Sequence, residues 1–396
     1  MTSCSEKNVF DCIVVGGGPA GLIASLECAS RDLTVCLIAL EMNEPDGRTT
    51  ALMQGSIAYL DTLDLSDEIK ASAAPLVTMR LIDDTGRLFR APETTFHASE
   101  LELPAFGYNL SNVELNSILK RRVSDCKNIC WIKSKVTNVT TEGLHAIANT
   151  QDQCYKASLL IGADGRKSMI RETAGIGIKN WDYPQAAMVV NLSHTIAHNN
   201  ISTEFHTKTG PFTLVPLAKN KSSLVCVVTR EQAGPLSELS EENLCNELER
   251  RSHHILGKFS LISKPAIFPL SGFVANKNFG QRTALVGESA HAFPPIGAQG
   301  LNLSLRDIQN LGALLEKAMM SGKDVGSPEV LQEYHTDRRT DIWTRTAGVH
   351  LLNLSLISDF PLLQPGRATG LYLSSKITFL RKHLMRAGLN IPLARR

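Results

Sequence analysis

The segment Gly16-Gly17-Gly18-Pro19-Ala20-Gly21 limits the fold of this chain more than any other feature of the sequence. It satisfies the pattern GxGxxG and stands between an apolar run, Phe10–Val15, and a stretch of small residues from Pro19 to Arg31. A second apolar run follows at Thr34–Ile38. Strand, glycine turn, helix and strand within about 30 residues predict the opening βαβ unit of a doubly wound parallel sheet.

The three glycines of this pattern predict a bound dinucleotide rather than a plain structural turn. Gly16 permits a tight turn, Gly18 lets a pyrophosphate approach backbone N–H groups, and Gly21 permits close packing of the helix. An acidic residue usually ends the second strand and binds the adenosine ribose. The expected position holds Ala39, and Glu41 lies two residues later. We expect Glu41 to take over that contact.

Two further turns follow apolar strands and indicate which dinucleotide binds. One is Gly162-Ala163-Asp164-Gly165, after a predicted strand at Leu159–Ile161. The other is Gly287-Glu288, after a predicted strand at Thr283–Val286, and a Pro-Pro-x-Gly loop and a helix from about Leu301 to Ser321 come next. Ligands of open α/β sheets collect at the carboxyl ends of the strands. An acid there can accept hydrogen bonds from ribityl hydroxyls, and exposed N–H groups can face a flavin ring.

A different pattern, typical of antiparallel strands, interrupts the first domain twice. Val77 to Pro92 contains two short strands around Asp83-Asp84-Thr85-Gly86, whose Asp and Gly residues suit a hairpin turn. β-branched strands recur later, with one amphipathic helix at Glu241–Arg251; the strands are Ala187–Leu192, Pro211–Leu217 and Ser223–Thr229.

The predicted fold class is therefore α/β, or α+β overall, with a Rossmann-like nucleotide domain and an inserted antiparallel sheet. We assign residues 1–75, 106–182 and 276–325 to the discontinuous nucleotide domain. Residues 76–105 and 183–275 form the substrate-binding sheet domain, and residues 326–396 form a C-terminal helical extension.

Composition excludes several other classes of protein. The 396 residues are 43% hydrophobic, so a disordered chain is excluded, and 41 Lys+Arg balance 39 Asp+Glu, which gives no footprint for nucleic acid. The nine cysteines form no CxxC pair, and the N-terminus lacks an export signal, so we expect reduced thiols and a cytoplasmic protein. No stretch is apolar enough to suggest a membrane span.

No motif predicts a metal site or a hydrolytic triad. The pair His253-His254 does not share a helical face, and Cys126 and Cys130 have no further ligand nearby. His291, beside the Pro-Pro-x-Gly loop, is more often a hydrogen-bonded structural group than a catalytic one in such a position.

Three motifs in this order resemble the FAD-dependent aromatic hydroxylases, the group A flavoprotein monooxygenases with the p-hydroxybenzoate hydroxylase fold. The motifs are GGGPAG, GADGRKS and GESAHAFPPIGAQGLN, and the resemblance covers about residues 9–390. Within that group the chain is most similar to the ubiquinone-biosynthesis hydroxylases of the UbiH/UbiF/VisC type. The segments that favour this subfamily are Arg48–Leu52, Phe106–Asn109, Pro211–Pro216, GAQGLNLSLRD and Arg367-x-x-Gly370-Leu371.

The resemblance implies specific roles for residues of this chain toward FAD. Gly16, Gly18 and Gly21 would bind the pyrophosphate, and Arg48 would approach the flavin or the ribityl chain. Asp164 would bind FAD, and Glu288, where the family usually has Asp, would keep the ribityl contact. The flavin edge would be lined by Pro295, Gly297, Gly300 and Asn302; Pro295 and Gly297 are the candidates nearest the chemistry, and no catalytic side chain is assigned.

The function implied is an FAD-dependent monooxygenase that uses NAD(P)H and O₂. It would hydroxylate the aromatic ring of a polyprenylated phenol in ubiquinone biosynthesis through a C4a-hydroperoxyflavin, and it could belong to a ubiquinone-biosynthesis complex. Three alternatives stay open: a hydroxylase of a soluble aromatic acid, a prenyl-double-bond reductase of the same fold, and an inactive flavoprotein-like subunit.

The C-terminal segment, residues 371–396, is basic and contains no Asp or Glu. Its leucines alternate with Lys376, Arg381, Lys382 and Arg386, which suits an amphipathic helix on an anionic membrane surface. A helix that caps the substrate domain fits the same pattern. We expect peripheral contact with the inner face of a membrane because substrates of the family carry polyprenyl tails.

Overall fold

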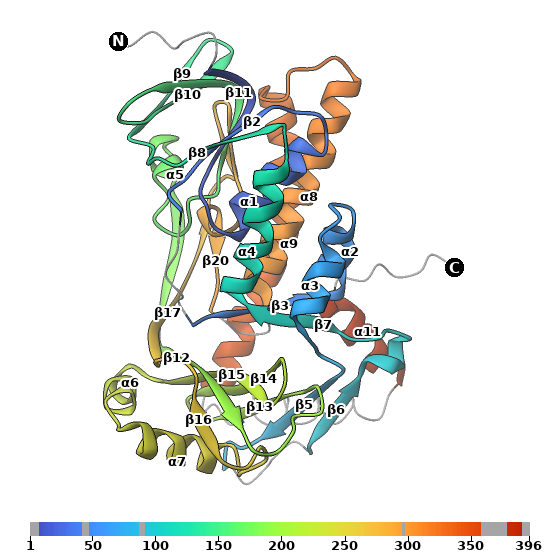
Figure 1. Ribbon diagram of the computed structural model, residues 1–396, viewed down its shortest axis with the longest axis vertical. Helices are drawn as coiled ribbons and strands as arrows, with labels where there is room; N and C mark the ends of the chain where they lie inside the picture. The colour runs from blue at the N-terminus through green and yellow to red at the C-terminus, as the bar shows by residue number, and fades with distance from the viewer. Residues whose placement is uncertain (1–7, 42–46, 87–91, 295–297, 358–377, 390–396) are drawn as a thin grey trace.

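The computed structural model of the protein describes residues 8–41, 47–86, 92–294, 298–357 and 378–389. Two large sheets occupy opposite halves of the molecule (Figure 1). Two long strands, β12 (Ile178–His194) and β17 (Ala266–Ala275), run from one half to the other.

The first sheet is built on five parallel strands in the order β19-β11-β1-β2-β8. Their bounds are β1 (Val9–Val15), β2 (Val35–Ile38), β8 (Ile129–Ile132), β11 (Cys154–Gly162) and β19 (Thr283–Leu285). Three short antiparallel strands complete it: β9 (Asn138–Glu142), β10 (His145–Asn149) and β18 (Phe279–Gly280). The βαβ unit predicted from the glycine motif is confirmed.

Both faces of this sheet are buried, as the continuous apolar run in β1 requires. Cys12 and Val14 pack against one set of helices, and Ile13 and Val15 pack toward β9, β10 and the short helix α5 (Met169–Thr173). The helices on the first face are α1 (Pro19–Ala29), α4 (Asn112–Asp125), α8 (Gln299–Met320) and α9 (Pro328–Ile357).

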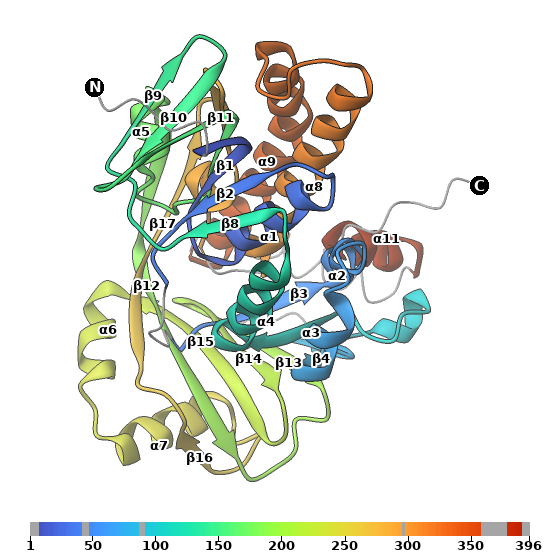
Figure 2. The same cartoon turned by 45° about the horizontal axis from the view of Figure 1, so that its top comes forward.

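The second sheet has the strand order β20-β17-β12-β15-β14-β13-β5-β6. Its other bounds are β5 (Thr78–Asp83), β6 (Thr94–His97), β13 (Ile201–Thr207), β14 (Gly210–Leu217), β15 (Lys221–Thr229), β16 (Phe259–Leu261), which pairs with β12, and β20 (His291–Ala292). The helices α6 (Arg230–Ser237) and α7 (Glu241–Arg251) cover the face turned away from α1, α4 and α8 (Figures 1 and 2).

The expected antiparallel pattern of this sheet is wrong at one place. β5 pairs with β13 in parallel, with Thr78 beside Ile201. The hairpin partner β6 begins at Thr94, beyond the predicted end of the hairpin at Pro92.

β12 begins at Ile178 and crosses the predicted boundary between residues 182 and 183. The division into domains stays a prediction.

A small third sheet connects the two halves. Its order is β3-β7-β4, with β3 (Thr49–Met53), β4 (Ala74–Pro75) and β7 (Gly107–Ser111). The remaining elements are α2 (Gln54–Asp61), α3 (Ser66–Ser72), η2 (Ala98–Leu101), η3 (Gly287–Ser289) and α11 (Thr378–Leu389). None of the described helices combines the length and the apolar content that a bilayer span requires.

The C-terminal helix α11 uses its apolar residues inside the protein. Met385 and Leu389 are buried with Met53 and Phe106, and the Arg381 guanidinium forms an ion pair with Glu100 (Nε to Oε2, 2.5 Å). The packing follows the capping alternative for this helix. Arg367 and most of the predicted membrane segment lie outside the described residues.

Seven of the cysteines in the described ranges are free thiols, and most of them are buried. Cys154 is disulfide-bonded, so the expectation of reduced thiols throughout the chain is wrong at this position.

Candidate cofactor site

Three turns meet at the carboxyl ends of β1, β11 and β19. A Cβ atom on Gly16 would lie 2.2 Å from the carbonyl oxygen of Ala163, so the first two turns are in contact. A Cβ atom on Gly287 would lie 3.4 Å from the Cβ of Ala20 and 2.8 Å from the Oγ of Ser304. The third turn therefore lies between the first turn of α1 and the second turn of α8. Motifs separated by more than 270 residues converge on one edge of the sheet.

The glycine turn leaves the start of α1 open to a ligand. Gly16 has a φ of +130°, and a Cβ atom on Gly21 would lie 1.9 Å from the carbonyl oxygen of Gly16, so neither position accepts a side chain. A Cβ atom on Gly18 would meet nothing within 4 Å. α1 begins at Pro19, and no side chain caps it. An uncapped helix start with open space beside it suits an anion such as a pyrophosphate.

Glu288 presents a carboxylate on the same side of the sheet. Its side chain is exposed, whereas its neighbours Gly287 and Ser289 are buried. Ser289 is fixed by its Oγ, which lies 2.6 Å from the carbonyl oxygen of Gly162. The turn thus holds Glu288 on a rigid base with its carboxylate accessible.

Asp164, predicted to bind the cofactor, is engaged within the protein. Its Oδ1 accepts a hydrogen bond from Ser168 Oγ (2.5 Å), and its Oδ2 accepts one from the backbone N–H of Ile170 (3.1 Å). Both carboxylate oxygens therefore stabilise the start of α5. No sequence pattern indicates this role, because a capping carboxylate and a ligand-binding carboxylate occupy the same kind of turn.

Glu41 lies beyond the end of β2, and its carboxylate contacts Lys133. The Nζ of Lys133 is 2.9 Å from Oε2, and this hydrogen bond and the lysine charge hold the pKa of Glu41 below its ordinary value. Both side chains are exposed. A ribose in this place would have to share the carboxylate with Lys133.

Asn302 joins β3 to the start of α8. Its Oδ1 accepts hydrogen bonds from Met53 N (2.8 Å) and Ser56 Oγ (2.7 Å), and its Nδ2 donates to the carbonyl oxygens of Ala51 (2.8 Å) and Ala298 (2.6 Å). Asn302, which was predicted to line the flavin edge, therefore uses its side chain to clamp the start of α8 to residues 51–56.

The other predicted residues near the flavin edge are exposed or outside the described ranges. A Cβ atom on Gly300 would meet nothing within 4 Å. Arg48 is exposed, and its guanidinium carbon lies 5.9 Å from the ring centroid of Phe268 in β17. Pro295 and Gly297 lie outside the described residues.

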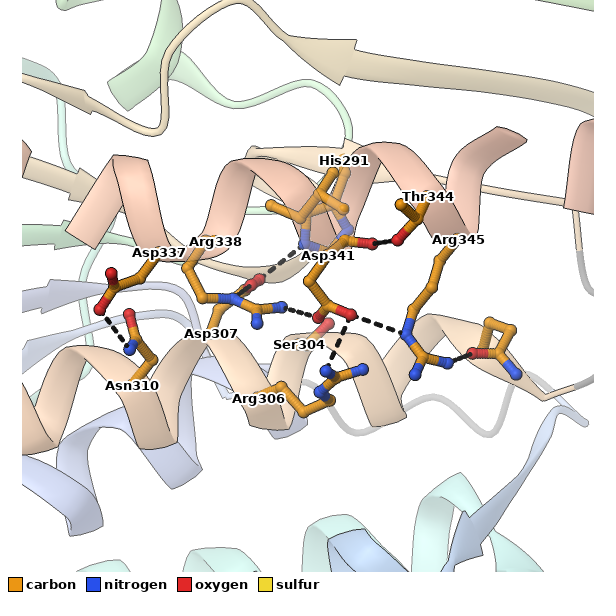
Figure 3. A network of polar contacts seen from close by, with 12 residues as sticks. His291, Ser304, Arg306, Asp307, Asn310, Asp337, Arg338, Asp341, Thr344 and Arg345 are labelled. Atoms are coloured by element: carbon orange, nitrogen blue, oxygen red, sulfur yellow. Dashed lines mark hydrogen bonds and ion pairs between the residues drawn. The ribbon is translucent and has the colours of Figure 1, made fainter. Parts of the chain in front are cut away.

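A buried charged network behind the third turn was not predicted from the sequence (Figure 3). Asp307 of α8 is fully buried; its Oδ2 lies 2.6 Å from His291 Nε2 and accepts a hydrogen bond from Gly287 N (3.1 Å). Its Oδ1 accepts one from Arg338 Nε of α9 (2.8 Å). One carboxylate thus connects the 287–291 turn to two helices.

His291 has the structural role that we expected. Besides its contact with Asp307, its ring stacks on Phe293, with 5.3 Å between the centroids. Farther along α9, Asp341 pairs with Arg306, Arg338 and Arg345, and Arg345 donates to Gln299 at the start of α8 (Figure 3). The described residues contain no group of three side chains suited to hold a metal ion.

Comparison with known proteins identifies the family. The FAD binding domain family matches residues 9–347. The chain belongs to this family. It is therefore an FAD-dependent flavoprotein of the monooxygenase type, and FAD is its cofactor.

Curated relatives resemble this member of the family over most of its length. Ubiquinone hydroxylase UbiL of Rhodospirillum rubrum is 31% identical over 352 residues, which cover 86% of this chain and 80% of the relative. The 3-demethoxyubiquinol 3-hydroxylase of Escherichia coli is 26% identical, with 96% of this chain and 98% of the relative covered.

A solved structure shows the same fold. The p-nitrophenol 4-monooxygenase PnpA from Pseudomonas putida DLL-E4 has a TM-score of 0.80 and 19% identity, and the match covers 98% of this chain and 100% of that chain. The p-hydroxybenzoate hydroxylase fold predicted from the motifs is confirmed.

The geometry of the three turns fits FAD. The open start of α1 beside Gly18 suits the pyrophosphate, and the exposed Glu288 carboxylate suits hydroxyl donors. Like α1, α8 begins without a side-chain cap, after Ala298 in the left-handed region (φ 53°).

Proposed function

We propose that the protein hydroxylates the aromatic ring of a polyprenylated phenol in ubiquinone biosynthesis, with NAD(P)H as electron donor and O₂ as co-substrate. The observation that carries the proposal is the convergence of the three turns on an open helix start, in a chain whose curated relatives are named as ubiquinone hydroxylases. The bound flavin supplies the redox chemistry, and the protein supplies position and exclusion of water.

The residues proposed to hold FAD act on different parts of the cofactor and in different ways. Gly16, Gly18 and Gly21 shape the pyrophosphate site, and Arg48, Glu288 and Gly300 approach the ribityl chain and the flavin edge. Glu41 contacts the ribose only by sharing its carboxylate with Lys133. Asp164 and Asn302 act through the backbone of the turns that they hold, since their side chains are bonded within the protein. The assignment of Pro295 and Gly297 to the flavin edge stays a proposal from the sequence.

Complementation tests the proposed function directly. The gene is expressed in strains that each lack one ring hydroxylase, and the accumulated quinone intermediates are identified by mass. Rescue of at least one strain is expected. Failure to rescue any strain, with the protein expressed and carrying FAD, contradicts the assignment to ubiquinone biosynthesis. Substrate turnover without O₂ uptake points instead to the prenyl reductase, and a protein that stays colourless with excess FAD points to the inactive subunit.

Glu288→Gln is expected to weaken FAD binding by about tenfold, because a hydrogen bond to a charged acceptor is worth about 1.5–3 kcal/mol and the neutral amide keeps part of it. Glu288→Asp, which retains the charge, should bind FAD within about threefold of the wild type. Titration of the apoprotein with FAD, followed by flavin fluorescence, measures both. Equal FAD affinity in Glu288→Gln and the wild type would remove Glu288 from the site.

Peripheral contact with an anionic membrane, from the cytoplasmic side, is proposed through the basic side of α11. Lys382, His383 and Arg386 are at least partly exposed, whereas Met385 and Leu389 are buried. The contact would therefore be electrostatic, worth about 1 kcal/mol for each basic residue near the surface. Membership of a biosynthetic complex stays a prediction.

Sedimentation with vesicles of anionic phospholipid tests this contact. Lys382→Glu with Arg386→Glu should reduce the bound fraction at low salt at least tenfold, and removal of residues 371–396 should reduce it further. Lys323→Glu, at an exposed position after α8, is the matched control. Equal sedimentation of all variants would show that the C-terminal segment does not bind the membrane.

A further inference from the structure

The second sheet has one face that looks toward the cofactor turns. The other face is covered by α6 and α7, which bury Met188, Phe212 and Cys226. On the face toward the cofactor turns, here called the inner face, Asn191 donates to the carbonyl oxygen of Gly47 (2.9 Å), and Gln185 accepts from Asn353 of α9 (2.9 Å). Because side chains along a strand alternate between faces, the strand register identifies every residue that shares this inner face.

The inner face contains a buried row and, next to it, a row that is partly exposed. Ala187 and Val227, which pair across β12 and β15, are 0% and 1% exposed. The next row of paired residues runs from β15 to β13 and is partly exposed throughout; its members are Val225, Thr213 and Glu204. Val215 on β14 is also partly exposed. These four residues form the central patch, in which Val225 and Val215 are apolar and Thr213 and Glu204 are polar.

Glu204 is held in the central patch by two neighbours. Its Oε1 lies 2.9 Å from His206 Nε2, and its Oε2 accepts a hydrogen bond from Thr213 Oγ1 (3.2 Å). The Glu204 side chain keeps 19% of its surface exposed, whereas that of His206 keeps 6%. A carboxylate has about four acceptor positions, so these two contacts leave capacity for a ligand. Glu204 thus combines a fixed position with an accessible acceptor.

The other charges on this part of the inner face are few. Asp83 of β5 pairs with His206 in the register, and its Oδ1 accepts from the hydroxyl of Thr85 (2.7 Å). Leu81 of β5 pairs with Glu204 of β13 in the same register. β14 carries no ionisable side chain. Glu204 is therefore the carboxylate of the central patch, beside the apolar residues Leu81, Val215 and Val225, and partial burial strengthens a hydrogen bond to a charged acceptor.

We propose that Glu204 accepts a hydrogen bond from the ring hydroxyl of the substrate and so positions and activates the phenol. The inference rests on the proposed function, since it assigns the polar anchor of a substrate whose remainder is apolar. A proton drawn toward Glu204 leaves more electron density on the ring, which favours attack by the ring on an electrophilic oxygen. The Glu204 carboxylate and the ring hydroxyl share only a proton, and no electron moves between them. The proton stays with the ring oxygen when the product leaves.

A comparison of two ligands on two proteins tests the role of Glu204. The ligands are a phenol with a short isoprenoid side chain and its methyl ether, which lacks the hydroxyl proton. Each is titrated into the FAD-loaded protein, and binding is followed by the flavin absorbance. The wild type should bind the phenol about 10- to 100-fold more tightly than the ether. Glu204→Gln should reduce this ratio about tenfold and lower kcat with the phenol, at unchanged FAD affinity.

Two further variants separate this role from a structural one. Thr213→Val removes one donor to Glu204 and should give a smaller loss of the phenol-to-ether ratio than Glu204→Gln. Glu231→Gln lies on α6, over the opposite face, and should leave the ratio unchanged. A fall in the melting temperature of Glu204→Gln with an unchanged ratio would overturn the proposal and leave Glu204 a structural residue.

The outcomes also distinguish the failure of this role from that of the proposed function. A wild type that hydroxylates the phenol, yet binds phenol and ether equally, overturns the role of Glu204 and leaves the proposed function standing. A wild type that binds FAD but neither binds nor hydroxylates any prenylated phenol overturns the proposed function, and the role of Glu204 with it.

Discussion

Gly21→Ala is expected to abolish FAD binding and to lower the free energy of unfolding by about 3 kcal/mol. This value is at the upper end of the range of costs that overpacking usually has, because the site is rigid. The added Cβ atom would lie 1.9 Å from the carbonyl oxygen of Gly16 and 3.4 Å from the Cβ of Ala163. The first contact is with backbone, which cannot move aside as a flexible side chain can. α1 would have to shift away from β1, and the pyrophosphate site would open with it.

Gly18→Ala separates the effect on the cofactor from the effect on the fold. Its Cβ atom would enter open space, and the backbone has φ −80° and ψ 175°, which alanine adopts freely. The variant should therefore melt within about 2 °C of the wild type, since its free energy of unfolding changes by less than about 0.5 kcal/mol. It should nevertheless bind FAD at least tenfold more weakly, because the methyl group occupies the place of the pyrophosphate.

Gly348→Ala in α9 is the matched control for both glycine variants. A Cβ atom there meets nothing within 4 Å, and the position is helical and exposed, so alanine should be neutral or slightly stabilising. Thermal unfolding and FAD titration of the three variants give the complete comparison. Normal FAD affinity in both Gly18→Ala and Gly21→Ala would show that the cofactor does not use this turn.

The elements that could be predicted from sequence are those specified by local patterns. The capping serine before α7 and the apolar periodicity of that helix define Glu241–Arg251 completely. β1 and α1 follow from an apolar run and a glycine turn. The parallel pairing of β5 with β13 joins residues more than 120 positions apart, and nothing in either strand encodes its partner.

The same distinction separates the predicted and unpredicted parts of the site. The glycines and Glu288 stand in turns whose chemistry is local, and the structure brings these turns together. Asp164 and Asn302 match ligand motifs, but their polar atoms are used by neighbours that only the folded chain provides. Glu204 carried no signal, since its role depends on which strand residues remain partly exposed after α9 covers the sheet. Asp307 likewise becomes significant only when α8, α9 and the 287–291 turn meet.

Asp307→Asn is expected to lower the free energy of unfolding by about 3 kcal/mol, the lower end of the range for breaking a buried ion pair. The amide would leave the buried Arg338 guanidinium without its nearest counter-charge, although Asp341, 2.8 Å away, compensates in part. It would also weaken the contacts to His291 and to the N–H of Gly287. Because Gly287 precedes Glu288, the same variant should bind FAD several-fold more weakly.

The stabilisation by Asp307 should disappear in acid. Burial raises the pKa of Asp307, but the charges of His291 and Arg338 and their hydrogen bonds outweigh it, so the pKa lies below its ordinary value of 3.8. A carboxyl whose pKa is lower in the folded state stabilises the protein above its unfolded pKa, and the stabilisation is lost as the pH falls through the folded pKa. The difference between the wild type and Asp307→Asn should therefore shrink as the pH falls below about 4.

Asp337→Asn is the control for the Asp307 variant. Asp337 precedes Arg338 on the same helix, is exposed, and accepts a hydrogen bond from Asn310 (3.2 Å) at the surface, so its loss should cost less than about 0.5 kcal/mol. Urea unfolding of the three proteins between pH 3 and 7 measures the free energies. A loss in Asp307→Asn no larger than in Asp337→Asn would mean that the buried network does not hold the third turn, and the proposed support of Glu288 by α8 and α9 would fail.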